Sequence, residues 1–569
     1  MMNARNLCYV SPDFPFENSR RPPVGPIRLG DDDLDAASSS RRWILAALLV
    51  TGVVLRFWCF SGLVGSDDLS YAHNAHALLE GAYQPIASPL SNRIGHIGLI
   101  AFFFGVLGVS EYALIASPLL FSMLQIVLAY AFLHRIGRPR AALIAAGYLA
   151  VAPWDVVFAT RGYPDLPSAA LFAAFVTLLL VAATARGRSR TAIAFGAGLC
   201  LGAAYLVKEM VILQMLYWAP ALLWVAWREK QLRIRDLAAA GIGAVCVVLG
   251  EGIGYYAATG DFLFRFHGVD TGYNQTVWSG TALYQNLVQR VFVIGPRSLL
   301  FDNVYLMGFA LGPILYLGTS WKDRPMRLIL GWLLFDIAYF VAGSSSLTAY
   351  NPLPLFRRYM LMMAFPAALL IGVGLDRWWT EQRDPARAKA FGATLAAAAV
   401  VIALGAVVNR QLLIGAAAGC VFAAAIVAFV RRPTVSVALA AAGSVLLLGA
   451  GLKEAYPTRY HSAWAEHQLH AALTDSTRPV FADGRTIEIL RFFNGYRDMD
   501  RYRDLFRATR DDVRNALVVV NEPRVAFAQE HYGDKLPEWI RGGPPPGFRL
   551  VSQVGGDKPG EAIFLFYAP

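Results

Sequence analysis

The feature that most constrains this chain is a series of long apolar runs that recurs from residue 42 to residue 451. A helix rises about 1.5 Å per residue, so about 20 apolar residues cross a hydrocarbon core of about 30 Å. Only helices and closed barrels satisfy the backbone in lipid, and continuous runs rich in Ala and Leu favour helices. Thirteen spans are expected, at 42–61, 97–134, 141–153, 165–184, 191–207, 210–227, 236–258, 301–320, 328–343, 358–375, 390–407, 412–430 and 434–451.

Within 97–134 we expect a re-entrant or interfacial helix, followed by a full span from about residue 111. The composition agrees with a lipid environment. Of the 569 residues, 56% are hydrophobic and 16% are charged. The mean hydropathy of +0.44 lies above that of ordinary soluble domains. The chain is therefore predicted to be an α-helical polytopic membrane protein.

Lys and Arg gather in alternate loops, and this asymmetry predicts the orientation of the spans. Nineteen of these residues lie in the loops 135–140, 186–190, 228–235, 322–327, 377–389 and 431–432. The positive-inside rule places these loops and the N-terminus in the cytoplasm and the C-terminus outside. We therefore expect a multi-pass protein of the cytoplasmic (inner) membrane with a periplasmic or extracytoplasmic C-terminus. The net charge of +11 then reflects topology, so no nucleic-acid partner is expected.

This topology divides the chain into three parts. Residues 1–40 are expected to form a disordered cytoplasmic tail. Residues 41–451 form the transmembrane module, with outer loops at 62–96 and 259–300, and residues 452–569 form a soluble domain on the outer face. Because the first apolar run is long enough to span, no cleavable signal peptide is expected.

The outer domain is predicted to be a small α/β fold. Strand-like runs at 479–482, 516–521 and 561–568 alternate with helix-like runs at 486–496 and 511–518, of which the last overlaps a strand. The domain contains no cysteine, which excludes a disulfide framework there.

The first outer loop carries two adjacent acids just beyond the first span, in VGSDDLSYAHNAHALLEG. Asp67 or Asp68 could act as a general base. The alternative is structural, because Ser66 or Asp67 could cap the helix that residues 72–79 suggest.

The residues after this acidic pair resemble a known superfamily. His96 in NRIGHIGLI is followed by FGVLGVSEYAL at the start of a span, and this order resembles the multi-span glycosyltransferases of the GT-C superfamily. Within it, the chain is similar to the branch of protein O-mannosyltransferases and the aminoarabinose transferase of lipid A. The resemblance covers about residues 42–375 and implies a GT-C-like fold with a catalytic Asp in the first loop.

A second acid stands between two prolines in FATRGYPDLPSAAL, at the outer mouth of the fourth span. Pro164 and Pro167 are expected to break the helix, so that Asp165 sits on irregular backbone facing a cavity. The alternative is an acid that caps the span. The resemblance implies a second functional Asp at this position.

Two further segments place charges at the outer membrane boundary. Lys208 and Glu209 end the fifth span, where an ionisable pair is costly unless it is paired or faces a cavity. Arg357, Arg358 and Tyr359 begin the tenth span, against the topological trend. Two Arg beside a Tyr suit a phosphate. The structural alternatives are that Lys208 is a snorkelling Lys at a helix end and that the Arg and Tyr residues form an interfacial anchor. The resemblance implies that Lys208 and this basic-plus-Tyr signature approach a donor phosphate.

Weaker candidates complete the set. Arg93 and His96 precede the second span, and Arg290 and Arg297 lie in the 259–300 loop, where any Arg could be a further phosphate ligand.

The expected activity is transfer of a sugar, with inversion, from a polyprenyl-phosphate donor to a glycolipid, polysaccharide or protein acceptor on the outer face. Asp67 or Asp68 would be the base, and Asp165 would position the acceptor or share the base role. The donor phosphate would be held by Lys208, Arg357, Arg358 and Tyr359. If the acceptor is itself a phosphate, no base is needed. No metal site is expected, although adjacent acids could hold a divalent cation.

Two other classes of function compete with this one. A transporter or flippase of lipid-linked saccharides would also use many spans and outer Arg residues, but no internal repeat is visible. A non-catalytic assembly factor would depend on residues 452–569 and tolerate changes at Asp67.

Overall fold

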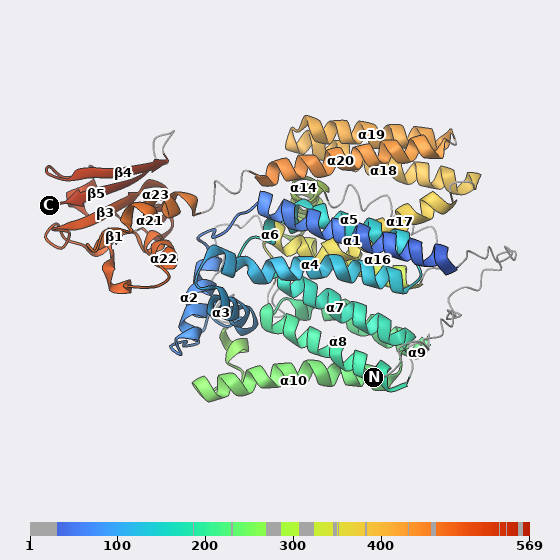
Figure 1. Cartoon of the computed structure of the whole chain (residues 1–569), viewed down its shortest axis with the longest axis horizontal. Helices are drawn as coiled ribbons and strands as arrows, with labels where there is room; N and C mark the ends of the chain where they lie inside the picture. The colour runs from blue at the N-terminus through green and yellow to red at the C-terminus, as the bar shows by residue number, and fades with distance from the viewer. Residues whose placement is uncertain are drawn as a thin grey trace.

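A computed structural model describes residues 31–185, 187–228, 232–268, 286–305, 324–344, 350, 352–381, 384–430, 432–456, 463–533, 535–541, 543–555 and 562–569. Long helices lie side by side in one module, and a smaller α/β domain lies beyond one end of them (Figure 1).

The long helices of the module follow the predicted spans closely. They are α1 (Asp31–Trp58), α4 (Glu111–Arg135), α5 (Pro139–Val151), α7 (Asp165–Thr184), α8 (Gly187–Val207), α9 (Val211–Arg228), α10 (Ile234–Thr259), α16 (Arg324–Ala342), α17 (Leu361–Glu381), α18 (Pro385–Asn409), α19 (Leu412–Phe429) and α20 (Pro433–Ala455). Ten helices in the described residues are long and apolar enough to cross a membrane. A multi-pass helical membrane fold is therefore confirmed.

Three details differ from the sequence prediction or fall outside it. Helix α1 begins at Asp31, so the expected disorder is wrong for residues 31–40. The predicted span at 301–320 lies mostly outside the described residues, as do residues 1–30 and much of the 259–300 loop. The run 97–134 divides into a short apolar helix, α3 (Ile94–Leu107), and the span α4, which begins at Glu111.

Two spans are more deeply enclosed than the others. Within their most apolar windows, 72% of α7 and 78% of the segment Arg357–Glu381 are buried inside the protein. Helices at the centre of a bundle have packed neighbours on every side, so residues at their ends are held in fixed positions. Asp165 begins α7 and Arg358 lies at the start of the second segment.

Short elements gather at the end of the bundle that faces the outer domain (Figure 1). They are α2 (Asp67–Leu79), α3, α6 (Pro153–Phe158), α13 (Leu287–Gln289), the π-helix η1 (Arg290–Ile294), α14 (Gly295–Asp302) and the 3-10 helix η2 (Arg357–Met360). They connect the spans on the side that the Lys and Arg counts predict to be outside.

The outer domain contains a five-stranded mixed sheet in the order β2-β1-β3-β5-β4. Its strands are β1 (Val480–Ala482), β2 (Tyr502–Asp504), β3 (Ala516–Asn521), β4 (Arg549–Gly555) and β5 (Ala562–Ala568). Strand β1 runs parallel to β2 and β3, with Val480 opposite Tyr502 and Leu517, whereas β5 runs antiparallel to β3 and β4.

The helices of this domain are α21 (Trp464–Leu473), α22 (Gly484–Phe493), α23 (Glu522–Tyr532) and α24 (Glu538–Arg541). The three predicted strands are confirmed, and α22 occupies most of the predicted helix at 486–496. The predicted helix at 511–518 is wrong, because turns lead directly into β3. Burial on both faces of β3 makes it a continuous apolar strand, and that pattern outweighs the weak helical spacing before it.

Candidate active site

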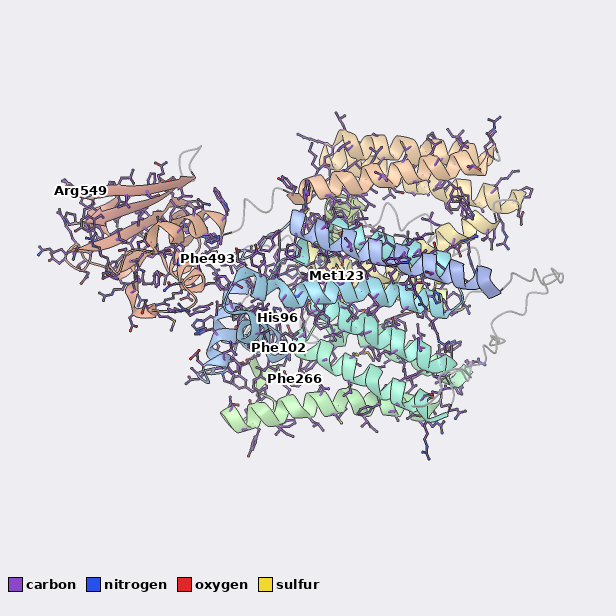
Figure 2. The ribbon with its side chains drawn as sticks, viewed as in Figure 1. His96, Phe102, Met123, Phe266, Phe493 and Arg549 are labelled. Carbon is purple, nitrogen blue, oxygen red and sulfur yellow. The ribbon has the colours of Figure 1, made fainter. Side chains whose placement is uncertain are left out.

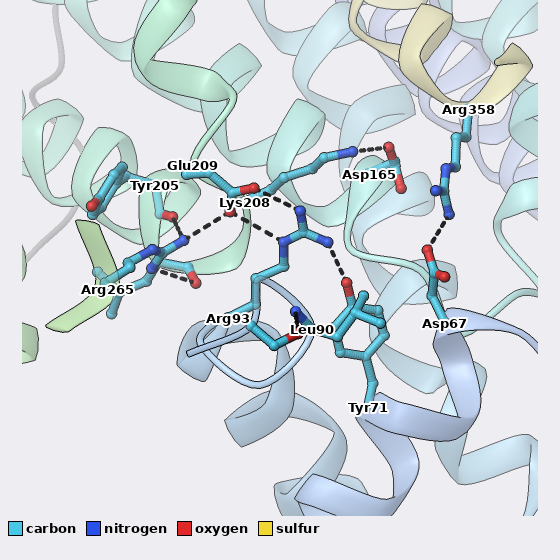
Figure 3. Close-up of polar contacts among 12 residues, drawn as sticks. Asp67, Tyr71, Leu90, Arg93, Asp165, Tyr205, Lys208, Glu209, Arg265 and Arg358 are labelled. Atoms are coloured by element: carbon cyan, nitrogen blue, oxygen red, sulfur yellow. Dashed lines mark hydrogen bonds and ion pairs between the residues drawn. The ribbon is translucent and has the colours of Figure 1, made fainter. Parts of the chain in front are cut away.

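Asp67 and Arg358 form an ion pair at the end of the bundle next to the α/β domain, although 291 positions separate them in the chain. Asp67 begins α2, and its Oδ2 accepts a hydrogen bond from Arg358 Nη1 at 2.7 Å (Figure 3). The guanidinium also lies 5.1 Å and 5.4 Å from the ring centres of Tyr163 and Tyr359. Both charged side chains keep a fifth to a quarter of their surface exposed, so the pair remains accessible.

A second ion pair joins Asp165 to Lys208 beside the first (Figure 3). Asp165 is the first residue of α7, and Lys208 lies in the short turn between α8 and α9. Both residues are buried, and Lys208 Nζ lies 4.2 Å from the centre of the Tyr359 ring.

The expectation that prolines would place Asp165 on irregular backbone is wrong. Helix α7 starts at Asp165 and continues through Pro167, because the first turn of a helix does not require the N–H that proline lacks. An acid in this first turn also interacts favourably with the helix dipole.

Three of these four charged side chains, Asp165, Lys208 and Arg358, line a narrow cavity of about 50 Å³, together with Tyr359. Its other polar lining residues include Ser168, Gln214 and Asp336, and its apolar ones are Met210, Leu213, Phe340, Leu353, Met362 and Met363. The cavity thus combines two cations with apolar side chains.

The environment of Lys208 makes it a cation with an unusual pKa. Burial, together with the charges of Arg93 and Arg358, lowers the pKa of Lys208 to about 8, although Asp165 opposes this shift. The ammonium is therefore mostly charged at neutral pH and becomes neutral in mildly alkaline solution.

The adjacent acids Asp67 and Asp68 point to different partners. Asp68 is fully buried, and its carboxylate accepts hydrogen bonds from the backbone N–H groups of Val64 and Ser66 at 2.5 Å and 2.6 Å. Burial raises the pKa of Asp68, and these hydrogen bonds counteract the rise. The Ser66 side chain does not cap α2. Asp68 thus organises its own loop, and Asp67 alone faces Arg358.

Glu209 belongs to a separate network of buried charges. Its carboxylate accepts from Arg93 Nη2 at 2.6 Å and Nε at 3.1 Å, and from Arg265 Nη2 at 3.3 Å. Burial alone would raise the pKa of Glu209, but the Arg93 and Arg265 guanidinium groups hold it well below its usual range. Arg265 also contacts Glu251, and Arg93 also donates to the Tyr71 hydroxyl. The network ties three outer segments together.

Gly95 permits the close approach that this network needs. A Cβ atom at residue 95 would lie 2.7 Å from the backbone carbon of Leu206, near the end of α8. Only glycine leaves room for α3 to approach α8 so closely. The neighbouring Arg93 therefore reaches Glu209 just beyond the end of that helix.

His96 is buried between the first loop and the segment before α7. Its Nε2 lies 3.1 Å from the carbonyl oxygen of Gly162, and its ring meets the edge of Tyr71. Burial lowers the pKa of His96 to about 4, so the ring is neutral at physiological pH. Its surroundings fit a structural role in packing.

Arg357 faces away from the cavity that Arg358 lines. Its guanidinium contacts Asp302 at 2.8 Å and Glu454 at 3.1 Å, and it lies 4.3 Å from the centre of the Trp154 ring system. Consecutive residues of a 3-10 helix point about 120° apart, so the two neighbouring Arg residues of η2 serve different surroundings. The structure therefore does not bring Arg357 to the site of Lys208.

The two remaining candidates also lie apart from the cavity. Arg290 is fully buried and donates to the backbone carbonyls of Val341, Phe340 and Leu353 at 2.7–3.0 Å. Arg297 is exposed on α14. Burial with three carbonyl partners indicates that Arg290 holds backbone segments together.

Tyr163 and Asp336 are residues at the site that sequence reasoning did not select. The Tyr163 ring centre lies 5.1 Å from the Arg358 guanidinium, and Asp336 lines the same cavity as Arg358, near Gln214. An acid within an apolar span is itself a signal of function, and that signal could have identified Asp336. Nothing in the sequence distinguishes Tyr163 from other interfacial tyrosines.

Metal binding finds no support in the described part of the chain, where no group of three or more His, Cys, Asp or Glu side chains could hold an ion.

Comparisons with known proteins give one family and several structures. Residues 96–250 match the model of the dolichyl-phosphate-mannose-protein mannosyltransferase family. No curated protein matches the chain in sequence.

Among solved structures, ArnT from Cupriavidus metallidurans bound to undecaprenyl phosphate is similar, with a TM-score of 0.57 at 16% identity, over 92% of this chain and 97% of that one. ArnT in the apo state gives 0.54 at 15% identity, over 93% and 98%. The apo oligosaccharyltransferase of Archaeoglobus fulgidus gives 0.50 at 12% identity, over 87% and 71%. The chain thus has the fold of the GT-C membrane glycosyltransferases, which confirms the resemblance seen in its sequence.

Proposed function

We propose that this chain is an inverting glycosyltransferase that uses a polyprenyl-phosphate-linked sugar on the outer face of the cytoplasmic membrane. The observation that carries the proposal is the contact between Asp67 and Arg358, whose guanidinium lines a cavity together with Lys208 and several apolar side chains. A base, two cations and apolar side chains are the groups that such a donor requires. The undecaprenyl phosphate bound in the similar ArnT structure supports a lipid phosphate as the ligand.

The donor phosphate binds between Arg358 and Lys208. Guanidinium groups pair with phosphate through charge-assisted hydrogen bonds, and the buried ammonium of Lys208 adds a second positive charge. Met362 and Met363 line the same cavity, where flexible thioether side chains can adapt to a prenyl chain. The lipid therefore leaves the site toward the membrane.

Asp67 can keep its contact with Arg358 when the donor binds. Arg358 donates to Asp67 through Nη1, and a guanidinium has further N–H groups for a phosphate. Asp67 then lies beside the bound phosphate, where it accepts the proton of an acceptor hydroxyl.

The chemical step is a single displacement at the anomeric carbon. The acceptor oxygen, as its proton passes to Asp67, attacks the anomeric carbon from the face opposite the phosphate. The bond from that carbon to the phosphate oxygen breaks, and polyprenyl phosphate departs. Arg358 and Lys208 stabilise the charge that grows on the departing phosphate.

Asp165 acts on this site through Lys208. The carboxylate at the start of α7 pairs with the ammonium and fixes it beside the Tyr359 ring. A glycolipid, polysaccharide or protein hydroxyl can serve as the acceptor. With a phosphate acceptor, Asp67 would orient the acceptor without removing a proton.

The test is an assay of polyprenyl phosphate released from radiolabelled donors that are extracted from the native membranes. Purified wild-type protein should release polyprenyl phosphate, whereas Asp67→Ala and Asp67→Asn should not. Asp68→Ala reports on the loop rather than the base and should retain a measurable rate if it folds. Asp302→Asn, which alters the carboxylate beside Arg357, is the matched control.

Two results would refute the proposal. A wild-type rate in folded Asp67→Ala would exclude this acid as the base. Movement of intact donor across a vesicle membrane without release of polyprenyl phosphate would instead identify a flippase.

A further inference from the structure

The loop that carries Asp67 is enclosed between the membrane module and the outer domain. Residues 61–66 connect α1 to α2, and both sides of this loop make hydrogen bonds to its backbone. The loop is therefore a joint of the two domains as well as the support of the proposed base.

On the membrane side, the module satisfies successive N–H groups of the loop. Thr160 accepts from Ser61 N through its hydroxyl at 3.1 Å and from Gly62 N through its carbonyl at 3.0 Å. Glu111 Oε1 accepts from Leu63 N at 2.8 Å, and Asp68 accepts the next contacts. These bonds fix the loop on one side only.

On the opposite side, the outer domain binds the carbonyl groups. Ala463 N, at the start of α21, donates to Leu63 O at 2.9 Å, and Arg485 Nη1, in the first turn of α22, donates to Ser66 O at 3.2 Å. Leu63 and Ser66 bracket the residues that lead into Asp67. The outer domain thus completes the set of contacts that fixes this backbone.

Gly65 shows how closely the outer domain approaches. Its φ of +74° lies in the left-handed region, and a Cβ there would stand 2.9 Å from Ile489 Cδ1 and 3.1 Å from Arg524 Nη2. Ile489 belongs to α22 and Arg524 to α23. A glycine is required at this point on both conformational and steric grounds.

The part of the outer domain that meets the loop is the carboxyl edge of its parallel strands. Strand β1 leads into α22 and β3 leads into α23, so the first turns of both helices lie at that edge. Open α/β sheets use this edge to bind ligands. Figure 2 shows Phe493, at the end of α22, on the side facing the membrane module and Arg549 on the opposite side.

Side-chain hydrogen bonds fix Arg485 within its own domain. Asp483 caps α22 and accepts from the N–H groups of Arg485 and Thr486 at 3.1 Å and 3.0 Å. Buried Asn521 donates to the Thr486 hydroxyl at 3.0 Å and to Glu466 on α21 at 3.2 Å. These bonds join α22, which carries Arg485, to α21, which Ala463 precedes.

We propose that the outer domain positions the proposed base, with Arg485 and the Ala463 N–H acting as positioning groups through the backbone of residues 63–66. Neither group touches the substrates. The inference rests on the proposed function, because it concerns the reach of Asp67 toward the acceptor. A displacement of about 1 Å at a reacting group can reduce a rate by about 100-fold, so weak contacts at this loop can strongly affect turnover.

The alternative is that these contacts only hold two domains together. The same interface offers a matched control, because Glu488 lies one turn from Arg485 on α22. Among the described residues its ion-pair partners are His73 of α2, at 3.9 Å, and Arg491, and neither belongs to the loop. Glu488→Gln weakens the interface, whereas Arg485→Ala also removes a hydrogen bond to the loop.

Two substitutions each remove one loop contact with small structural change, and a third restores one. Arg485→Ala removes the donor to Ser66 O, and Arg485→Lys restores a cationic donor of similar length. Ala463→Pro removes the donor to Leu63 O. The φ of Ala463 is −68°, which proline adopts, and this N-terminal position makes no use of its N–H within α21.

The experiment measures kcat, the donor KM and the hydrogen exchange of loop amides in purified full-length protein. Arg485→Ala and Ala463→Pro should each lower kcat by about 10-fold, and together by about 100-fold, with donor KM within about twofold of wild type. Exchange at residues 61–66 should quicken in both, Arg485→Lys should recover most of kcat, and Glu488→Gln should match wild type.

Wild-type kcat and exchange in both variants would overturn the proposal, as would an equal loss in Glu488→Gln. Failure of wild-type protein to release polyprenyl phosphate would refute the proposed function instead. In that event the exchange measurement still decides whether the outer domain fixes the loop.

Discussion

Two neighbouring Arg residues of η2 occupy different surroundings. Arg358 pairs with one carboxylate, lines a cavity and lies near a buried ammonium. Arg357 pairs with two carboxylates, Asp302 and Glu454, and rests on an indole ring. Two carboxylates thus balance the charge of Arg357, whereas Arg358 has one carboxylate partner and lines the same cavity as Lys208. Neighbours in sequence can therefore differ in function because of their partners alone.

The largest expected effect comes from replacing, one at a time, the carboxylates that pair with Arg358 and Arg357 by amides. Asp67→Asn should lower kcat by about 1,000-fold, because a positioned general base contributes about 100- to 10,000-fold. Asp302→Asn, which faces Arg357, should leave kcat within about threefold. Rates of sugar transfer and melting temperatures of both proteins make the comparison, and similar losses in the two would remove the distinction.

The Arg residues themselves give the next effect. Arg358→Ala should reduce kcat/KM for the donor by about 100-fold or more, since it removes a charge that stabilises the departing phosphate. Arg357→Ala should change kcat/KM little and lower Tm by about 2 °C, because partly exposed ion pairs contribute little to stability. Steady-state kinetics with thermal unfolding separates them. A larger kinetic loss in Arg357→Ala would reverse the assignment.

The pH dependence of ligand binding tests whether Lys208 contributes a positive charge to the cavity. Because burial lowers the pKa of Lys208 to about 8, the ammonium loses its proton as pH rises through that value. Affinity for a phosphodiester analogue of the donor should therefore be full below the pKa and fall by about tenfold on the alkaline side. The phosphodiester does not titrate in this range. Lys208→Arg should flatten the profile, and an unchanged wild-type affinity would exclude this Lys from the anion site.

The smallest expected effect belongs to an Arg outside both regions. Arg297 is exposed on α14, so Arg297→Ala should leave donor affinity within about twofold of wild type. Equilibrium binding of the same analogue measures this. A tenfold loss would show that the donor extends beyond the cavity described above.

The fold and the location of the site were largely predictable, and the pairing of side chains was not. Hydrophobic runs locate the spans because a helix needs about 20 apolar residues to cross the lipid. The distribution of Lys and Arg among the loops then predicts that Asp67, Asp165, Lys208 and Arg358 lie at the same end of the bundle. The directions in which the Arg357 and Arg358 side chains point depend on the 3-10 geometry of η2, which no sequence pattern predicts. The contrast between Asp67 and Asp68 likewise depends on which carboxylate the loop backbone captures.

Glu209 shows a second limit of sequence reasoning. A charged pair at a membrane boundary predicts function for both members. Lys208 does reach the cavity, but Glu209 turns to Arg93 and Arg265, whose positions depend on distant segments. Partners more than 50 positions away are set by packing, and no local pattern reports them.

The most direct test of the central claim is mass spectrometry of the lipids that co-purify with wild-type protein, Arg357→Ala and Arg358→Ala. If Arg358 binds the donor phosphate, wild type and Arg357→Ala should retain a polyprenyl-phosphate lipid, and folded Arg358→Ala should lack it. Equal retention in Arg358→Ala, or its loss only in Arg357→Ala, would contradict it.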